Sequence, residues 1–126
     1  MEGARATLDR LIAAFNARDY ETYATLCTDD VEAYAGVYTP LRFDGKAAWL
    51  AFVRGLEERF AMVTQEQRHV TVRTYGPDTA VSNGYFVFST VTKDGVSEAQ
   101  SGRQSFTLVK VADQWLVANL HFSALF

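Results

Sequence analysis

The residues best suited to proton chemistry lie near the end of the chain, around His121. An imidazole titrates near neutral pH, with an ordinary pKa of ~6.5, so His121 is a candidate general acid or base. Strand alternation places Asn119 and Ser123 on the same face as His121, and Arg103 or Ser105 is expected opposite them. These neighbours would orient the imidazole or a ligand. The competing interpretation is a hydrogen-bonded structural histidine at the end of a sheet.

A second group of candidates lies between residues 29 and 34. Tyr34 carries a phenol that would donate to a carbonyl or an oxyanion, although tyrosine also fills cores. Glu32 shares a strand face with Tyr34 and is the carboxylate best placed for a cavity. Asp29 and Asp30 are paired carboxylates, which can divide acid and base roles. Because this pair follows the end of a predicted helix, a solvated turn is the simpler expectation for it.

Aromatic residues supply the apolar part of the candidate site. Trp49 and Phe52 lie three residues apart on a predicted helix and are candidate ligand-binding residues, although the same spacing suits a core. Tyr38, in an irregular segment, is a candidate gate over the ligand. Nine Phe and six Tyr help to raise the aromatic content to 13%, which fits either a large core or an aromatic pocket.

Several other chemistries lack the residues that they need. A catalytic zinc ion requires three protein ligands, whereas the sequence has two histidines, His69 and His121, far apart. Cys27 is the single cysteine, so it has no partner for a disulfide within the chain, and no adjacent base activates its thiol. The sequence has no Gly-x-Ser-x-Gly elbow, Gly-x-Gly-x-x-Gly motif or phosphate-binding loop. We therefore expect neither a metal nor a nucleotide cofactor.

Composition narrows the class of partner. The net charge is −3 with both signs interspersed, so no basic stripe is available for nucleic-acid phosphates. The apolar runs are far shorter than the ~20 residues that cross a bilayer, and residues 1–5 lack the features of a signal peptide. We expect a cytoplasmic protein that binds neither nucleic acid nor membrane. Its 126 residues fit one domain, residues 1–126.

Three helices are predicted in the first half of the chain. Apolar residues at i, i+3, i+4 and i+7 from Leu8 predict a helix over residues 3–17. Asp19 is suited to cap a short second helix. A strong apolar period predicts a third helix over residues 46–60, with Gly55 inside it. Since glycine costs ~1 kcal/mol there relative to alanine, we expect a closely packed neighbour at Gly55.

The second half of the chain has the two-residue period of β-strands, interrupted by turn sequences. Strands are predicted at residues 70–75, 80–91, 97–111 and 115–123, after a short first strand at 31–34, and residues 36–44 remain unassigned. Lys93-Asp94-Gly95 is a strong hairpin signal. Helices followed by a meander of strands predict an α+β domain, with N-terminal helices packed on one face of an antiparallel sheet.

Unbroken alternation gives the last strand two different faces. One face carries Trp115, Val117, Asn119, His121 and Ser123, and the other carries Leu116, Ala118, Leu120 and Phe122. The bulk of Trp115 and Val117 suits the concave side, which would place His121 in a cavity. The apolar row of Leu116, Leu120 and Phe122 would then lie outside, where helices cannot cover it. A homodimer is expected to cover that row.

Three sequence motifs occur in a recognisable order along the chain: Asn16-Ala-Arg-Asp-Tyr20 followed by Tyr23, Leu26 and Cys27; Gly45 before an aromatic-rich helix; and Asp113-Gln-Trp115 running to His121-Phe-Ser123. With these motifs the chain resembles the nuclear-transport-factor-2-like (SnoaL-like) superfamily along essentially its whole length. The nearest resemblance is to the association domain of calcium/calmodulin-dependent kinase and its stand-alone bacterial relatives. It implies a cone-shaped, cystatin-like fold with a curved sheet, a conical cavity and dimerisation through the outer sheet face.

The resemblance leaves the activity open, because such relatives include ketosteroid isomerases, polyketide cyclases, dehydratases and non-catalytic modules. Several arginines line the kinase domain's pocket, but the matching positions here are Phe86 and Phe106, with Arg103 slightly displaced. The aspartates of the isomerase pattern are also not matched in the last two strands. We expect a pocket for an apolar aromatic or polycyclic, polyketide- or steroid-like compound. Cofactor-free isomerisation, cyclisation or dehydration would fit it; the alternative is a ligand-binding or homo-oligomeric assembly module.

Overall fold

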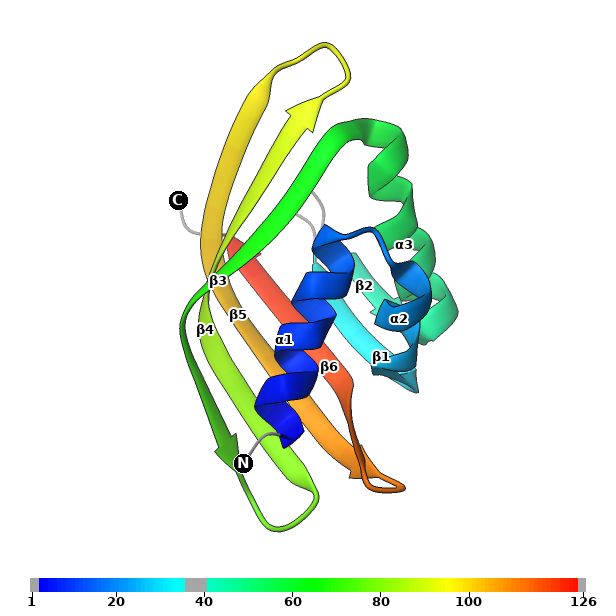
Figure 1. The fold of residues 1–126 in the computed structure, drawn as a ribbon, viewed down its shortest axis with the longest axis vertical. Helices are drawn as coiled ribbons and strands as arrows, with labels where there is room; N and C mark the ends of the chain where they lie inside the picture. Colours follow the sequence, from blue (N-terminus) through cyan, green and yellow to red (C-terminus); the bar gives the residue numbers. More distant parts are fainter. Residues whose placement is uncertain (1–2, 36–40, 125–126) are drawn as a thin grey trace.

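Helices and a curved sheet form two layers, with the helices on one side of the sheet (Figure 1). The structure is a computed structural model that describes residues 3–35 and 41–124. The helices are α1 (Gly3–Asn16), α2 (Tyr20–Thr25) and α3 (Lys46–Arg59). The strands are β1 (Cys27–Ala35), β2 (Leu41–Asp44), β3 (Phe60–Thr74), β4 (Thr79–Thr92), β5 (Ser97–Val111) and β6 (Gln114–Ala124). The predicted α+β class is confirmed.

The helices form where their apolar periods predict them. In α1, Leu8 and Leu11 are fully buried against the sheet, and Phe15 continues the same face. At the start of α2, the Asp19 side chain accepts a hydrogen bond from the Thr22 backbone N–H at 3.2 Å, as its capping role requires. None of the described helices is long and apolar enough to cross a membrane.

The described strands form one mixed sheet in the order β2-β1-β6-β5-β4-β3. Its pairings are antiparallel except for β1 with β6, which run parallel. β1 is longer than predicted, so Asp29 and Asp30 lie in a strand rather than in a turn. β2 pairs antiparallel with β1 and occupies part of the stretch that the sequence left unassigned.

A one-residue bulge divides β6. Thr107 of β5 lies opposite Asn119, but the next residue, Leu108, lies opposite Val117, so Ala118 has no partner on β5. Because successive side chains alternate between faces, this extra residue reverses the alternation of the rest of the strand. Trp115 and Val117 face the helices as predicted.

Beyond the bulge, Leu120 and Phe122 take the inward positions, while Asn119, His121 and Ser123 point outward. The prediction of unbroken alternation is therefore wrong. The outer apolar row predicted from it is also wrong, because Leu120 is 0% exposed and contacts the core within a single chain.

Side chains at the end of α1 and just after it cover backbone groups of the edge strand β3. The Asn16 carboxamide donates to the Gln65 carbonyl at 2.9 Å and accepts from the Gln65 N–H at 2.8 Å, as a neighbouring strand would. Arg18 donates to the Ala61 carbonyl at 2.8 Å. These bonds fix β3 against the helix layer and satisfy groups that an open edge would leave free.

The new register predicts that Leu120→Asp unfolds the chain instead of merely dissociating a dimer. An unpaired carboxylate in the core is expected to lower the free energy of unfolding by roughly 4 kcal/mol or more. His121→Asp, one residue away on the outer face, should retain its secondary structure. Circular dichroism during urea unfolding measures both effects, and a well-folded Leu120→Asp would contradict the register.

Gly55 has no close neighbour, contrary to the sequence expectation. A methyl group added there would meet nothing within 4 Å. We therefore predict that Gly55→Ala raises the free energy of unfolding by about 0.5–1 kcal/mol, because alanine restricts the unfolded chain. Gly102→Ala is the matched control and should destabilise, since its Cβ would lie 2.1 Å from the Ser123 carbonyl oxygen. Urea midpoints that shift in the same direction for both variants would contradict the prediction.

Candidate functional site

A cavity of about 870 Å³ lies between α3 and the inner face of the sheet. Residues from α1, α2, α3 and five of the described strands line it, and aromatic side chains dominate the lining: Phe15, Tyr23, Trp49, Phe52, Phe60, Phe86, Phe88 and Phe122. This volume lies within the ~300–1,000 Å³ range typical of small-molecule sites. The cavity is therefore the candidate functional site.

The helical wall follows from the spacing of aromatic residues on α3. Trp49 and Phe52 lie one turn apart, with ring centroids 5.5 Å apart and planes inclined by 23°. Phe43 of β2 packs against both rings, at 5.4 Å from Trp49 and 4.7 Å from Phe52. The Trp49 indole Nε1 donates to the Tyr23 hydroxyl at 3.1 Å, which ties α3 to α2 at the wall.

The sheet wall depends on a glycine. Phe86 of β4 stands edge-on to Phe122 of β6, with centroids 5.5 Å apart, and Phe106 does the same at 5.7 Å. Gly102 lies opposite Phe86 on β5, where an added Cβ would lie 2.5 Å from the Phe86 ring. Because Gly102 has no side chain, the Phe86 ring can occupy this space and line the cavity.

Three glutamines form a neutral polar chain beside the aromatic walls. Gln104 is 2% exposed; it accepts from Gln65 Nε2 at 3.2 Å and donates to Gln67 Oε1 at 2.6 Å. Gln65 lines the cavity, and its backbone is held by Asn16. The chain satisfies buried amides without placing a charge in the cavity.

Burial keeps the ionisable groups near the inner end neutral. It raises the pKa of the Tyr23 phenol well above its usual value, and it raises the pKa of the Cys27 thiol to about 12. Tyr23 is therefore a neutral hydrogen-bond donor, and Cys27 is no thiolate nucleophile at neutral pH. The charged residues of the described lining, Arg59 and Glu98, are both exposed and mark the opening. Within residues 3–35 and 41–124, no three His, Cys, Asp or Glu side chains gather to hold a metal.

Trp49 and Phe52 lie where a ligand-binding role requires, in the cavity wall. Trp49 is also part of the buried core, and Phe52 packs against it half-buried. Tyr38, the predicted gate, lies outside the described residues. The binding roles of these residues stay predictions.

The polar site residues predicted from the sequence lie on the outer face of the sheet, on the side away from the cavity. Their predicted placement in the cavity is therefore wrong. His121 is exposed and packs beside Tyr34, with ring centroids 5.4 Å apart. Glu32 pairs with Arg42 at 3.7 Å. Asn119 lies opposite Glu32 on the same outer face.

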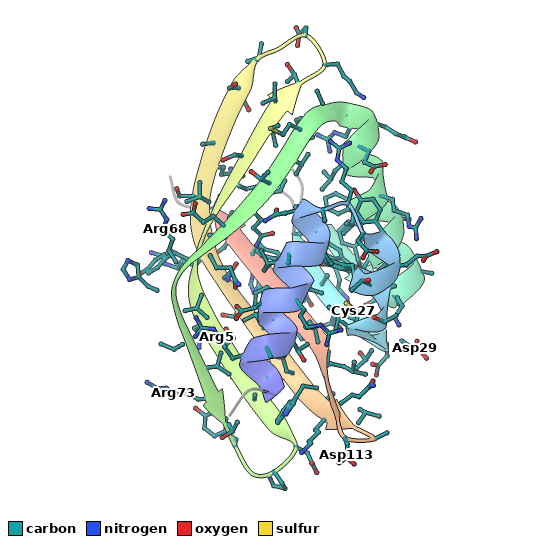
Figure 2. The ribbon with its side chains drawn as sticks, viewed as in Figure 1. Arg5, Cys27, Asp29, Arg68, Arg73 and Asp113 are labelled. Carbon is teal, nitrogen blue, oxygen red and sulfur yellow. The ribbon has the colours of Figure 1, made fainter. Side chains whose placement is uncertain are left out.

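Arg103, the remaining polar candidate, is exposed and lies opposite Tyr85 and Ser123. Figure 2 shows Arg68 and Arg73 of β3 likewise pointing away from the helices. The bulge at Ala118 is the physical reason for the difference at Asn119 and His121. Because His121 lies outside the cavity, the geometry does not support the acid–base role that was predicted for it there.

Sequence reasoning missed two polar residues, Tyr23 in the cavity lining and Gln104 behind it, where it bonds to the lining residue Gln65. From the sequence, Tyr23 is only one of the residues that carry the family resemblance, although it lies on the face of α2 that packs against Phe15, with ring centroids 6.4 Å apart. Gln104 alternates with Gly102 and Phe106 on the inward face of β5. A polar residue at an inward position was the signal that could have identified it.

Comparison with known proteins agrees with this fold. The profile of the calcium/calmodulin-dependent protein kinase II association domain matches residues 4–125. A search among proteins of curated function found no match. The structure superposes on the association domain of CaMKII from C. elegans with a TM-score of 0.74 and 19% identity, covering 94% of this chain and 90% of that one.

Two bacterial structures are similar as well. A protein from Xanthomonas campestris, provisionally named a CaMKII association domain, has a TM-score of 0.83 and 21% identity over 96% of this chain and 84% of that chain. A protein from Novosphingobium aromaticivorans, provisionally named a scytalone dehydratase, has a TM-score of 0.88 and 16% identity over 100% and 84%. At these identities the superpositions establish the nuclear-transport-factor-2-like, cystatin-like fold. With the profile covering nearly the whole sequence, the chain belongs to the calcium/calmodulin-dependent protein kinase II association domain family.

Proposed function

We propose that this protein binds a small, largely apolar aromatic or polycyclic molecule in the cavity between α3 and the sheet. The observation that carries the proposal is the lining: aromatic rings from both layers surround about 870 Å³. Aromatic rings prefer to pack offset or edge-on to one another. The rings of the lining therefore favour a flat aromatic ligand, which can pack against them in the same way. A few neutral polar groups, among them Tyr23 and Gln65, would fix its orientation.

The charges around the cavity favour binding over acid–base catalysis. A catalytic base must lie within hydrogen-bond reach of a substrate proton, whereas the one carboxylate in the described lining, Glu98, is exposed at the opening. Tyr23 would serve as a donor for developing negative charge, but it keeps its proton and is no base. Within the described lining, Glu98 is thus the one carboxylate that isomerisation, cyclisation or dehydration could use as a base.

We predict that the fluorescent probe 1-aminoanthracene binds the cavity with increased emission. Phe52→Ala removes one ring of the helical wall and should weaken binding about tenfold, equivalent to ~1.4 kcal/mol. Because Phe52 is only half-buried, the same change should cost less stability than the ~3–5 kcal/mol typical of a core Phe. Fluorescence titration and urea unfolding give the two values.

Tyr85→Ala removes an exposed ring from the outer face of β4 and is the control for this experiment. Its affinity for the probe should equal that of the wild type. Probe binding that responds to Tyr85 and not to Phe52 would move the site to the outer face and contradict the proposal.

A second function, homo-oligomeric assembly, is supported by the uncovered outer face of the sheet. Along that face, β5 and β6 bring Ser105 opposite His121 and Thr107 opposite Asn119, and Tyr34 of β1 extends the first of these rows. Tyr34 remains 37% exposed although its ring packs against His121. One matched relative is an association domain by name. We infer that a second copy covers this mixed polar and aromatic face, in place of the apolar row that the sequence suggested.

We predict that light scattering at micromolar concentration reports about twice the chain mass of 14.1 kDa. Thr107→Glu, in the middle of the face, should give monomers because it places a carboxylate in the interface without a partner cation. Ala17→Glu, exposed at the end of α1, should remain dimeric. Unchanged binding of 1-aminoanthracene would show that the monomeric variant is folded. A monomeric wild type would exclude the assembly function.

A further inference from the structure

The Tyr23 hydroxyl is a buried donor without a described acceptor. Tyr23 is 4% exposed and is one of the residues that line the cavity. Its oxygen accepts the Trp49 Nε1–H at 3.1 Å, and an indole nitrogen can only donate. The phenol proton therefore remains free to donate, because the bond from Trp49 is the one hydrogen bond of this hydroxyl within residues 3–35 and 41–124. A buried donor left unpaired favours a ligand that supplies an acceptor.

The surroundings of Tyr23 exclude charge on that acceptor. Its ring neighbours are the uncharged side chains of Trp49, which donates to its hydroxyl, and Phe15, with ring centroids 6.4 Å apart. Arg59, the cation of the described lining, is exposed and lies over the Phe60 ring at 5.3 Å. A carboxylate at Tyr23 would thus be buried without a counter-ion beside it, which is strongly unfavourable. A cationic group would meet a donor proton, which is also unfavourable.

We propose that the cavity selects uncharged aromatic ketones, with the ligand's carbonyl oxygen accepting a hydrogen bond from the Tyr23 hydroxyl. This inference rests on the small-molecule function proposed above and adds the class of ligand. The stacked rings of Trp49 and Phe52 supply a flat surface next to the donor. A carbonyl conjugated to an aromatic ring system lies in the plane of its rings, so one ligand can stack on that surface and reach Tyr23.

Three compounds with one tricyclic skeleton separate the contributions: fluorene, 9-fluorenone and fluorene-9-carboxylate. Isothermal titration calorimetry at neutral pH with the wild-type protein should give 9-fluorenone about tenfold higher affinity than fluorene. Fluorene-9-carboxylate should bind most weakly. Tyr23→Phe keeps the ring but removes the donor, and should bring the affinities of 9-fluorenone and fluorene to within about twofold of each other.

Tyr20→Phe is the matched control, because Tyr20 is on the same helix but is not part of the cavity lining. It should keep the tenfold preference for the ketone. Since each preference is a ratio measured within one protein, a general loss of stability in a variant does not mimic the result. If Tyr23→Phe fails to fold, equal affinities of the wild-type protein for fluorene and 9-fluorenone would still overturn the proposal.

The outcomes distinguish this inference from the function on which it rests. Equal wild-type affinities for fluorene and 9-fluorenone, or a ketone preference that survives Tyr23→Phe, would overturn the role of Tyr23 while leaving an aromatic pocket. Tightest binding of fluorene-9-carboxylate would overturn the requirement for a neutral ligand. Failure of all three compounds to bind would remove both the ligand class and the proposed pocket function.

Discussion

The unpaired residue Ala118 in β6 decides the chemistry of both faces of the sheet. Because side chains alternate along a strand, one extra residue moves all the following side chains to the opposite face. Val117 before the bulge and Leu120 after it can therefore both enter the core, although their spacing is odd. His121 is displaced outward by the same step. The inward position of Phe122 and the outward position of His121 are two consequences of one irregularity.

The interior chemistry follows from how the two layers meet. The apolar stripe of α3 presents Trp49 and Phe52 to the space that Phe86 and Phe122 reach from the sheet. The glutamine chain around Gln104 and the Tyr23 hydroxyl provide polarity without charge. Such a site distinguishes ligands by shape and by neutral hydrogen bonds, which supports recognition of an aromatic molecule more strongly than proton transfer.

Local signals in the sequence predicted much of the fold. The period of α3, the cap at Asp19 and the hairpin at residues 93–95 each depend on residues close together in the chain. The position of Trp49 in the cavity wall follows from the same local period, and its binding role stays a prediction. The register of β6 depends instead on how β5 pairs with it, and no local pattern marks Ala118 as unpaired. Face assignments for His121 and Asn119 were therefore wrong, while the strand itself was correctly predicted.

Interstrand nuclear Overhauser effects in the uniformly labelled protein test the bulge most directly. The bulged register predicts backbone contacts between Thr107 and Asn119 and between Leu108 and Val117, with Ala118 making no cross-strand pair. Side-chain contacts should join Leu120 to Phe106 across the inner face. A continuous register, with Thr107 opposite Ala118 and Gln104 opposite His121, would turn the His121 ring toward the aromatic residues of the cavity and would contradict it.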